Sequence, residues 1–465
     1  MLFSSIIFLF VFLPVVIAGY YILPFKAKNL WLLLSSLFFY FYGEPKYLVI
    51  MISVITMSYL FGLVTEKAKG TARKVILALS VALTLSALIY FKYTDFFISS
   101  VNGIFGTNID LIGIALPIGI SFYTFQAISY NIDVYRGDVP AQKNPLKLAL
   151  YVSLFPQLVA GPIVRYSDIE KALTERQHSI DNFSFGVRRF VTGLAKKVLL
   201  ANSLGSLCES FRATEDKSTL FFWIYAVAYC LQVYFDFSGY SDMAIGLGKI
   251  FGFEFMENFR YPYISKSVTE FWRRWHISLG SWFRDYVYIP MGGNRVKTPR
   301  FFFNILTVWF LTGFWHGADW TFIIWGLYFA VLLLIEKSIP KKIKDAVPAV
   351  FGHIYLIFAV IIGFVIFNGN GVEGVLSDLK GMFTSAYPLC TDITIYYLRS
   401  YAVLLCAGIF AATPAGKLAV QKLSDTKIGS KITAVAEPLF VVAVLVAVTA
   451  YLVDGSYNPF LYFRF

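Results

Sequence analysis

Long apolar stretches recur along the whole chain and are separated by short polar loops. Because a bilayer core requires about 20 apolar residues per helical span, the pattern predicts an all-α polytopic membrane protein. Roughly ten to twelve stretches are expected to span, and the rest would form interfacial or re-entrant helices. We find no polar linker long enough to divide domains and expect one integral membrane domain over residues 1–465. The apolar stretches cover residues 1–24, 29–42, 46–64, 75–91, 112–130, 146–163, 186–206, 218–250, 301–315, 318–335, 347–368, 396–412 and 436–453.

The charges of the loops predict the orientation of the chain, because Lys and Arg concentrate in cytoplasmic loops. Basic residues dominate the loops at 66–74, 337–344 and 417–431, which we therefore assign to the cytoplasm. Acidic residues dominate the loop at 368–392, which suits the outer face. Both termini are then outside, and residues 454–465 form an extracytoplasmic tail. The first stretch has no basic leader and no A-x-A cleavage site, so we expect it to be an uncleaved span.

The composition separates this chain from soluble proteins. It is 58% hydrophobic and 15% charged, whereas soluble domains carry about 25% charged residues. Because the apolar stretches recur along the whole length, a soluble catalytic domain on a single membrane anchor is excluded. The net charge of +12 mainly reflects cytoplasmic loops, with attraction of an anionic partner as a second interpretation. The four cysteines are widely spaced without a C-x-x-C motif, so neither a disulfide framework nor a metal site is predicted.

Residues 267–283 differ from the apolar spans, because arginines are interleaved with tryptophan and phenylalanine. Large apolar side chains fall on one helical face, and Arg273 and Arg274 fall on the other. Ser267-Val-Thr-Glu270 is typical of a capping box at a helix start. We predict one amphipathic helix in the cytoplasmic interface of the membrane. Its arginines would bind a polyanionic acyl donor, or alternatively only lipid headgroups.

The histidines are the first candidates for a site, because ionisable side chains at membrane depth are costly. His316 lies in a largely uncharged run, where Gly313 and Gly317 permit close backbone approach or a helix break. We interpret His316 as a general base in preference to a buried structural histidine. Asp319 is a candidate partner that would fix its tautomer.

The other three histidines are less distinctive. His276 lies on or beside the apolar face of the predicted interfacial helix, where it could enter a protein cavity. A catalytic and a structural role are equally supported for this residue. His178 lies in a polar loop and is interpreted as solvated, and His353 is interpreted as a helix-end or interface residue; neither is given a role.

Further polar residues occur in apolar settings, namely Asp236, Ser238, Tyr240 and Asn258. They could line a polar tunnel, although hydrogen bonding between helices is the better interpretation of each one alone. The chain contains no G-x-S-x-G elbow, P-loop, dinucleotide fingerprint or H-E-x-x-H motif. Most familiar classes of hydrolase, ATPase and metalloprotease are therefore excluded.

Five stretches in a fixed order carry a resemblance to a known family. They are Pro117–Gln126, Phe155–Pro162, Tyr234–Asp242, Phe271–Leu279 with Ile289–Arg295, and Phe314–Asp319. Together they resemble the membrane-bound O-acyltransferase superfamily, most of all its branch that O-acetylates bacterial alginate. The resemblance covers nearly the whole chain. It implies a ring of helices around a thinned centre with a tunnel between a cytoplasmic donor site and an outer acceptor site. It also implies that His316 is the catalytic histidine and His276 the second one.

The resemblance further implies the reaction. An acyl group, expected to be acetyl, would move from a cytoplasmic thioester across a bacterial cytoplasmic membrane for O-acetylation of an extracytoplasmic polysaccharide. The donor would be acetyl-coenzyme A or an acyl-carrier protein, with no tightly bound cofactor and no metal. Expected partners are membrane lipid, a secreted or membrane-anchored acyltransferase, and an exopolysaccharide or cell-wall polymer, but no nucleic acid. The expected substrate-binding residues are Asp236, Ser238, Tyr240, Asn258, Arg273, Arg274, Trp315 and Asp319.

The chain ends in an aromatic segment, residues 458–465. Its F-x-Y-F-x-F ending resembles a C-terminal motif of extracytoplasmic acyl-transfer systems, which implies that Tyr462 carries the acyl group to a partner enzyme. The alternative is an aromatic belt at the membrane surface. Two other functions remain as alternatives: a transporter or channel with a buried histidine pathway, and a lipid acyltransferase that acts on one face.

Overall fold

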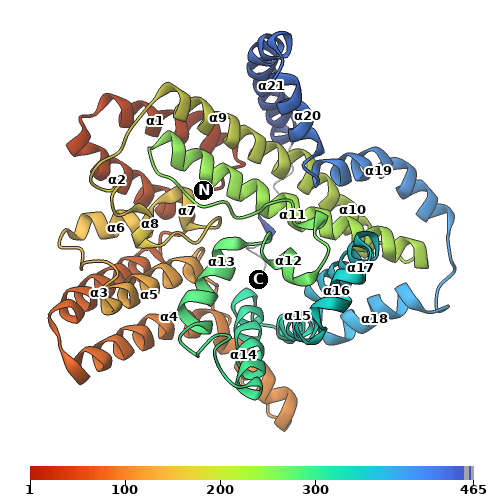
Figure 1. Cartoon of the computed structure of the whole chain (residues 1–465), viewed down its shortest axis with the longest axis horizontal. Coiled ribbons are helices and arrows are strands. Elements are labelled where there is room, and N and C mark those ends of the chain that lie inside the picture. The colour runs from red at the N-terminus through yellow and green to blue at the C-terminus, as the bar shows by residue number, and fades with distance from the viewer. Residues whose placement is uncertain (455–459, 462–465) are drawn as a thin grey trace. The chain divides into compact units, whose positions relative to one another are not determined.

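The computed structural model describes residues 1–454 and 460–461. Within this part of the chain every regular element is a helix, as the apolar pattern predicts (Figure 1). The residues divide into two compact units. Unit 1 consists of residues 1–190 and 241–256, and unit 2 of residues 191–240 and 257–465.

Unit 1 holds most of the N-terminal helices. Within it, α3 packs against α4, α5 and α6, and α2 packs against α6 and α7. The helices are η1 (Phe8–Phe12), α1 (Leu13–Ile22), α2 (Phe25–Gly43), α3 (Leu48–Lys67), α4 (Gly70–Phe105), α5 (Ile120–Arg136), α6 (Pro145–Ser153), α7 (Phe155–Leu158), α8 (Tyr166–Ile169) and most of α9 (Ile180–Ala195).

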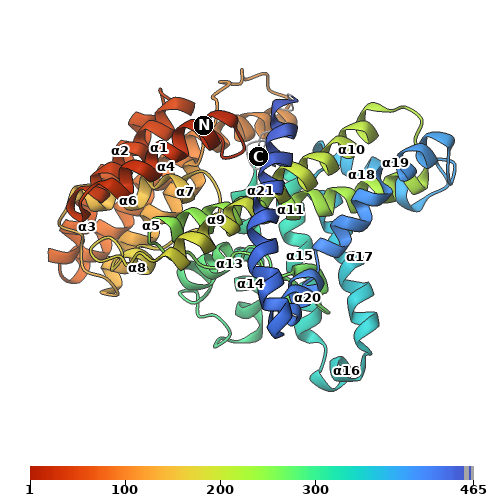
Figure 2. The same ribbon diagram turned by 90° about the horizontal axis from the view of Figure 1, so that it is seen from above.

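Unit 2 begins near the end of α9 and contains the larger part of α11 (Thr219–Ile250). Its α15 packs against both α14 and α17, and α20 packs against α21 (Figure 2). Its other helices are η2 (Lys196–Ala201), α10 (Asn202–Ala213), η3 (Pro262–Ile264), α12 (Val268–Trp272), α13 (Ile277–Phe283), η4 (Arg284–Tyr288), α14 (Thr298–His316), α15 (Trp320–Ser338), α16 (Lys341–Ala346), α17 (Ala349–Phe367), α18 (Gly371–Phe383), α19 (Asp392–Ala411), α20 (Ala415–Ser424) and α21 (Lys427–Val453).

Seven helices of the described chain are long and apolar enough to span a membrane: α3, α4, α11, α15, α17, α19 and α21. This is fewer than the ten to twelve spans expected from the sequence. Some predicted spans are broken in the structure; the stretch at 146–163, for example, forms the short helices α6 and α7. The ring of helices and the central tunnel remain predictions.

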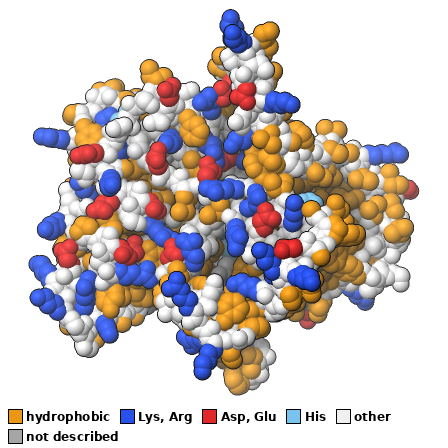
Figure 3. Space-filling view, viewed as in Figure 1, with side chains coloured by type: hydrophobic (Ala, Val, Ile, Leu, Met, Phe, Trp, Pro, Cys, Tyr) orange, Lys and Arg blue, Asp and Glu red, His pale blue; other side chains and the backbone are white. Residues whose placement is uncertain are grey.

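Several of these helices expose most of their apolar surface. In the most apolar window of α4 and of α19 only 17% of the residues are buried, and in that of α21 only 6%. Figure 3 shows hydrophobic side chains gathered over the region of α17 and α19. Water does not tolerate exposed apolar surface of this extent, whereas lipid chains solvate it. The chain is therefore a multi-pass membrane protein.

The core of unit 2 is strongly aromatic where α12, α14 and α15 meet. The indole of Trp272 lies 4.6 Å from that of Trp309 and 5.6 Å from that of Trp325, measured between ring centroids. Phe329 contacts the same ring at 4.9 Å. Such edge-on aromatic contacts bury large areas in a defined geometry, so this cluster fixes the position of α12 against α14 and α15.

Candidate active site

The candidate site residues that the structure describes all lie in unit 2. Three come from α11, and the others come from the segment 257–284 and from the end of α14 with the start of α15. Tyr462 lies outside the described residues, so its role stays a prediction.

The segment at 267–283 forms two short helices, α12 and α13, so the prediction of one continuous helix is wrong. Its start is as expected, since the Ser267 hydroxyl accepts a hydrogen bond of 3.0 Å from the backbone N–H of Glu270. The large apolar side chains that were predicted to share one helical face are buried in the protein core. The buried members of this face are Val268, Phe271, Trp275, Leu279, Trp282 and Phe283.

The helix is interrupted because a neighbouring segment takes over its backbone hydrogen bonds. The carbonyl of Arg274 accepts from the N–H of Arg260 at 2.9 Å, and the N–H of Ile277 donates to the carbonyl of Asn258 at 3.0 Å. His276, at the turning point, has φ +43°. A left-handed conformation costs a non-glycine residue on the order of 1 kcal/mol. This cost is borne at one of the two candidate catalytic histidines.

The environment of His276 defines its tautomer. Asn258 Oδ1 accepts hydrogen bonds from the Ser278 backbone N–H at 3.2 Å and from the Ser278 hydroxyl at 2.9 Å, so this atom is the amide oxygen. His276 Nδ1 lies 3.2 Å from the same oxygen and must donate to it. A neutral imidazole then carries its lone pair on Nε2, which is the arrangement that a general base requires.

The Nε2 atom of His276 is buried and has no hydrogen-bond partner among residues 1–454 and 460–461. Burial, and after it the neighbouring His316, holds the pKa of His276 well below its ordinary value of about 6.5. The imidazole is therefore neutral at physiological pH. A neutral ring with an unengaged lone pair is competent to take a proton from a substrate.

His316 is the last residue of α14 and is buried. Its ring packs edge-on against Trp325 at 5.0 Å, Trp315 at 5.2 Å and Phe367 at 5.5 Å. The centroid of the His276 ring lies 6.4 Å away, which is too far for a direct hydrogen bond between the two rings. The two histidines predicted from the sequence are thus brought together in an aromatic environment.

Close packing of α14 on α15 positions His316. A Cβ atom on Gly313 would lie 2.3 Å from the carbonyl oxygen of Phe322, so a larger residue does not fit. The predicted close approach at this glycine is confirmed. Asp319 caps α15, since its carboxylate accepts a hydrogen bond of 2.8 Å from the N–H of Thr321. Its proposed pairing with His316 stays a prediction.

Asp236 of α11 forms a buried ion pair with Lys197 of η2, at 2.5 Å. Its second oxygen accepts a hydrogen bond of 2.8 Å from the backbone N–H of Leu461. The paired charges offset the cost of burying either one alone. Asp236 thereby fixes the C-terminal segment directly before Tyr462 to the core of unit 2.

Phe460 is 3% exposed and extends this attachment toward the histidines. Its ring packs against Tyr240 at 5.1 Å and Phe237 at 5.7 Å. Phe237 in turn contacts the ring of His276 edge-on at 4.6 Å. The end of the described chain is therefore separated from a candidate catalytic histidine by a single aromatic ring. Ser238, on the same helix, is buried too.

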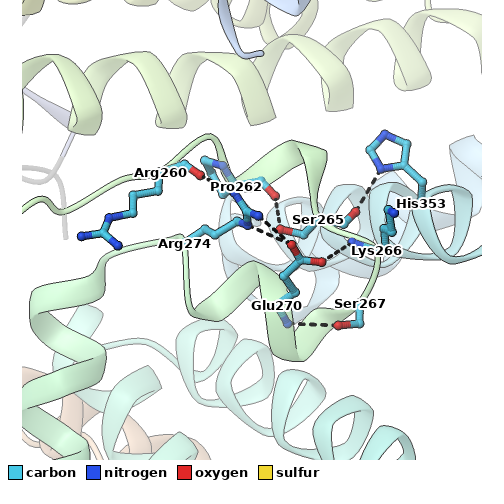
Figure 4. Close-up of polar contacts among 8 residues, drawn as sticks. All are labelled: Arg260, Pro262, Ser265, Lys266, Ser267, Glu270, Arg274 and His353. Atoms are coloured by element: carbon cyan, nitrogen blue, oxygen red, sulfur yellow. Dashed lines mark hydrogen bonds and ion pairs between the residues drawn. The ribbon is translucent and has the colours of Figure 1, made fainter. Parts of the chain in front are cut away.

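The two arginines of the predicted donor site differ in their surroundings. Arg273 is exposed. Arg274 bonds Glu270 through Nε at 3.0 Å and through Nη2 at 2.8 Å, and it donates to the carbonyl of Arg260 at 3.2 Å. Figure 4 shows Glu270 between this guanidinium and the backbone N–H of Lys266. Arg274 thus holds the loop before α12, and Arg273 is the one with its charge available to a ligand.

The remaining histidines have structural contacts. His353, in the first turns of α17, lies with Nδ1 3.0 Å from the carbonyl of Ser265, which fits the predicted helix-end position (Figure 4). His178 is half-buried and bonds the Tyr20 hydroxyl through Nε2 at 2.8 Å, so the prediction of a solvated histidine is wrong. Neither belongs to unit 2's histidine pair. Among the described residues, no group of three or more His, Cys, Asp or Glu is placed to hold a metal ion.

Comparison with known proteins identifies the family. The sequence profile of MBOAT, the membrane-bound O-acyltransferase family, matches residues 140–377. The chain is 40% identical to the probable alginate O-acetylase AlgI of Azotobacter vinelandii, with 100% of both chains covered. The chain belongs to the membrane-bound O-acyltransferase family. It is therefore an acyltransferase, and the resemblance seen in the sequence is confirmed.

More distant members act on other polymers. The chain is 36% identical to the peptidoglycan O-acetyltransferase of Helicobacter pylori, over 90% of this chain and 88% of the relative. It is 30% identical to the teichoic acid D-alanyltransferase of Bacillus subtilis, over 54% of this chain and 69% of the relative. The matched region of the MBOAT profile contains both His276 and His316.

Three residues of this MBOAT site were not predicted. Lys197 lies inside the apolar stretch 186–206, and the rule that singled out His316 would have found it, because a lysine at membrane depth also needs a partner. Phe237 and Leu461 carried no such signal, since apolar residues are abundant here and only the fold brings them to His276 and Asp236.

Proposed function

We propose that this acyltransferase takes an acetyl group from a cytoplasmic thioester, acetyl-coenzyme A or an acyl-carrier protein, and delivers it to a polysaccharide outside the membrane. The observation that carries the proposal is the buried, neutral His276 with its free Nε2 atom beside His316. The acceptor class rests on the relatives, which are named for acyl transfer to alginate, peptidoglycan and teichoic acid.

His316 acts as the general base in this proposal. It takes the proton of the acceptor hydroxyl while the hydroxyl oxygen forms a bond to the thioester carbonyl carbon. The C–S bond then breaks, and the departing thiolate receives the proton from the imidazolium. His276, with its lone pair on Nε2, is the second proton acceptor beside His316 and holds the acceptor hydroxyl by its O–H before that proton passes to His316. The aromatic walls around His316 exclude water, which would otherwise hydrolyse the thioester.

Tyr462 is the first acceptor hydroxyl. It follows Leu461, whose backbone is bound to Asp236, and one residue spans at most about 3.6 Å. A phenol is a poor nucleophile until a base removes its proton, and the resulting aryl ester is activated for a second transfer. A secreted or membrane-anchored acyltransferase would then pass the acetyl group to the polymer.

A cavity of about 510 Å³ in unit 2 supports approach of an acceptor or partner enzyme to this segment. Leu461 forms part of its wall, and polar side chains form much of the rest: Glu209, Arg212, Gln232 and Asn368. The loop-charge assignment puts Asn368, at the end of α17, on the outer side. Polar groups of this kind suit a hydroxyl-rich ligand.

The test uses purified protein in liposomes with radiolabelled acetyl-coenzyme A outside and polysaccharide inside. A second sample has the donor inside and the polysaccharide outside. We expect label on the protein and on the polymer across the membrane, and neither with His316→Ala. Label on lipid alone would favour a lipid acyltransferase acting on one face. Absence of any acyl transfer by the wild-type protein with both donors would contradict the proposal.

A further inference from the structure

Three basic side chains of unit 1 surround Tyr20, near the end of α1. Lys28 Nζ lies 4.5 Å from the centre of the Tyr20 ring, and the Arg176 guanidinium carbon lies 5.6 Å from it. His178 Nε2 is 2.8 Å from the Tyr20 hydroxyl oxygen. That hydroxyl donates its proton to the carbonyl of Phe251 at 2.7 Å, so His178 must be the donor in its own contact.

Arg176 is buried without a carboxylate partner. It is 8% exposed, and its Nη2 donates to Asn29 Oδ1 at 2.7 Å. Its Nε and Nη1 atoms are buried and make no hydrogen bond within the described ranges 1–454 and 460–461. No ion pair there involves Arg176, Lys28 or His178. A buried guanidinium with two unsatisfied donors is costly unless an anion reaches it.

The charges of the cluster repel one another. Burial, and after it the charge of Arg176, lowers the pKa of Lys28. Burial, with Lys28 and Arg176 as further causes, lowers the pKa of His178 as well. An anion bound between these groups would relieve the repulsion and reverse both shifts.

The backbone approaches the cluster closely at a glycine. Gly252 has φ +79°, and a Cβ atom there would lie 3.2 Å from both Arg176 Cβ and His178 Nε2. Lys28 and His178 are only partly buried, so a ligand can reach the cluster from the surface. Tyr20 lies near the end of α1, which ends at Ile22, and Lys28 lies in the first turn of α2. The cluster is therefore at the ends of two apolar helices.

We propose that Lys28, Arg176 and His178 form a phosphate-binding site in unit 1. A phosphate group offers several acceptor oxygens to the planar guanidinium fork of Arg176 and to the ammonium of Lys28. A bound anion also favours the protonated form of His178, whose Nδ1–H is then a further donor. Two ligands share this chemistry, a phospholipid headgroup at the membrane surface and the phosphates of a coenzyme A-type donor. The site involves neither histidine of unit 2 and does not depend on the proposed acyl transfer.

The test measures binding of three probes to protein in maltoside detergent, which carries no phosphate: dioctanoyl phosphatidylglycerol, coenzyme A and inorganic phosphate. Calorimetry gives affinities, and the rise of the thermal unfolding midpoint gives a second reading. Arg176→Gln should lower the affinity for the probe about tenfold or more, and Lys28→Gln should lower it several-fold. Lys26→Gln removes an exposed charge from the same first turn of α2, outside the cluster, and should leave the affinity unchanged.

Each outcome decides the proposal or the source of the phosphate. Binding of the phosphatidylglycerol with no response to coenzyme A identifies a lipid site, and the reverse identifies a donor site. If Arg176→Gln does not fold, Lys28→Gln and Arg176→Lys, which keeps the charge without the fork, give the same comparison. The proposal is overturned if no probe binds, or if the cluster variants bind as tightly as Lys26→Gln.

Discussion

The backbone N–H of Leu461 donates a hydrogen bond of 2.8 Å to Asp236 Oδ2, joining the C-terminal segment to α11 across 225 positions of sequence. Because Asp236 also forms a buried ion pair with Lys197, one carboxylate links three separate segments of unit 2. The attachment holds the residue before the proposed acyl carrier next to the aromatic rings around His276.

Asp236→Asn should release the C-terminal segment. The variant removes one partner of the buried Lys197–Asp236 ion pair, and such a change typically costs about 3 to 5 kcal/mol of unfolding free energy. The readout is the rate at which a carboxypeptidase trims the C-terminus of the detergent-purified protein. Asp242→Asn is the matched control, because Asp242 lies on α11 like Asp236 and forms an ion pair with Arg189 of α9. Equal trimming rates in the two variants would refute the attachment role.

His316→Ala should reduce acetyl transfer by a factor of about 10² to 10⁴, the usual loss on removing a positioned general base. Expression and thermal stability should change little by comparison. His353→Ala is the control, since His353 contacts only a loop carbonyl in the described structure. Transfer by His316→Ala at the rate of the control would remove this residue from the mechanism.

The depressed pKa of His276 predicts how stability depends on pH. Below about pH 6.5 the unfolded chain takes up a proton at this position, whereas the folded protein does not. Stability should therefore fall as the pH drops from about 6.5 toward the folded pKa, by at most about 1.4 kcal/mol per pH unit. Above that window the residue makes no contribution to the pH dependence.

His276→Asn is the variant that tests this dependence, because its amide keeps a donor near the Nδ1 position for Asn258. Thermal unfolding midpoints between pH 5 and 8 should depend less on pH in the variant than in the wild type. Parallel curves would show that His276 titrates normally and that its ring is accessible to protons in the folded state.

Tyr462→Phe should keep the aromatic tail but abolish acetylation of the C-terminal peptide, detected by mass spectrometry after incubation with donor. Transfer to polysaccharide should fall to background, because the variant lacks the hydroxyl that accepts the acyl group. Tyr451→Phe alters an exposed tyrosine of α21 and serves as the control. An unmodified wild-type tail with full polymer acetylation by Tyr462→Phe would leave the residue as a membrane anchor.

Arg273→Gln should weaken binding of a polyanionic donor, and the loss should shrink as salt is added, since exposed charges are screened within about 8 Å at physiological ionic strength. Arg274→Gln should also lower stability, because Arg274 bonds Glu270 and the carbonyl of Arg260. Donor affinity is measured by titration at several salt concentrations. A donor affinity that changes neither with salt nor in Arg273→Gln would indicate that the arginines only contact lipid headgroups.

The sequence alone was enough to predict a helical membrane protein and its family. Apolar stretches specify helices because an uncovered backbone must satisfy its hydrogen bonds internally in lipid, and α14 and α15 lie where those stretches predict them. The sequence also singled out His316, because an ionisable residue in an apolar run is rare without a reason. Local pattern carried all of this information.

Tertiary structure decided the rest. The helix predicted at 267–283 breaks because backbone groups of 258–260 replace its own hydrogen-bond partners. The pattern of apolar residues within 267–283 holds no information about that neighbouring segment. The approach of Leu461 to Asp236, and of Arg176 to Tyr20, likewise joins distant segments. Side-chain spacing fixes which face of a helix is apolar, but the contacts of a site depend on which faces meet when the chain folds.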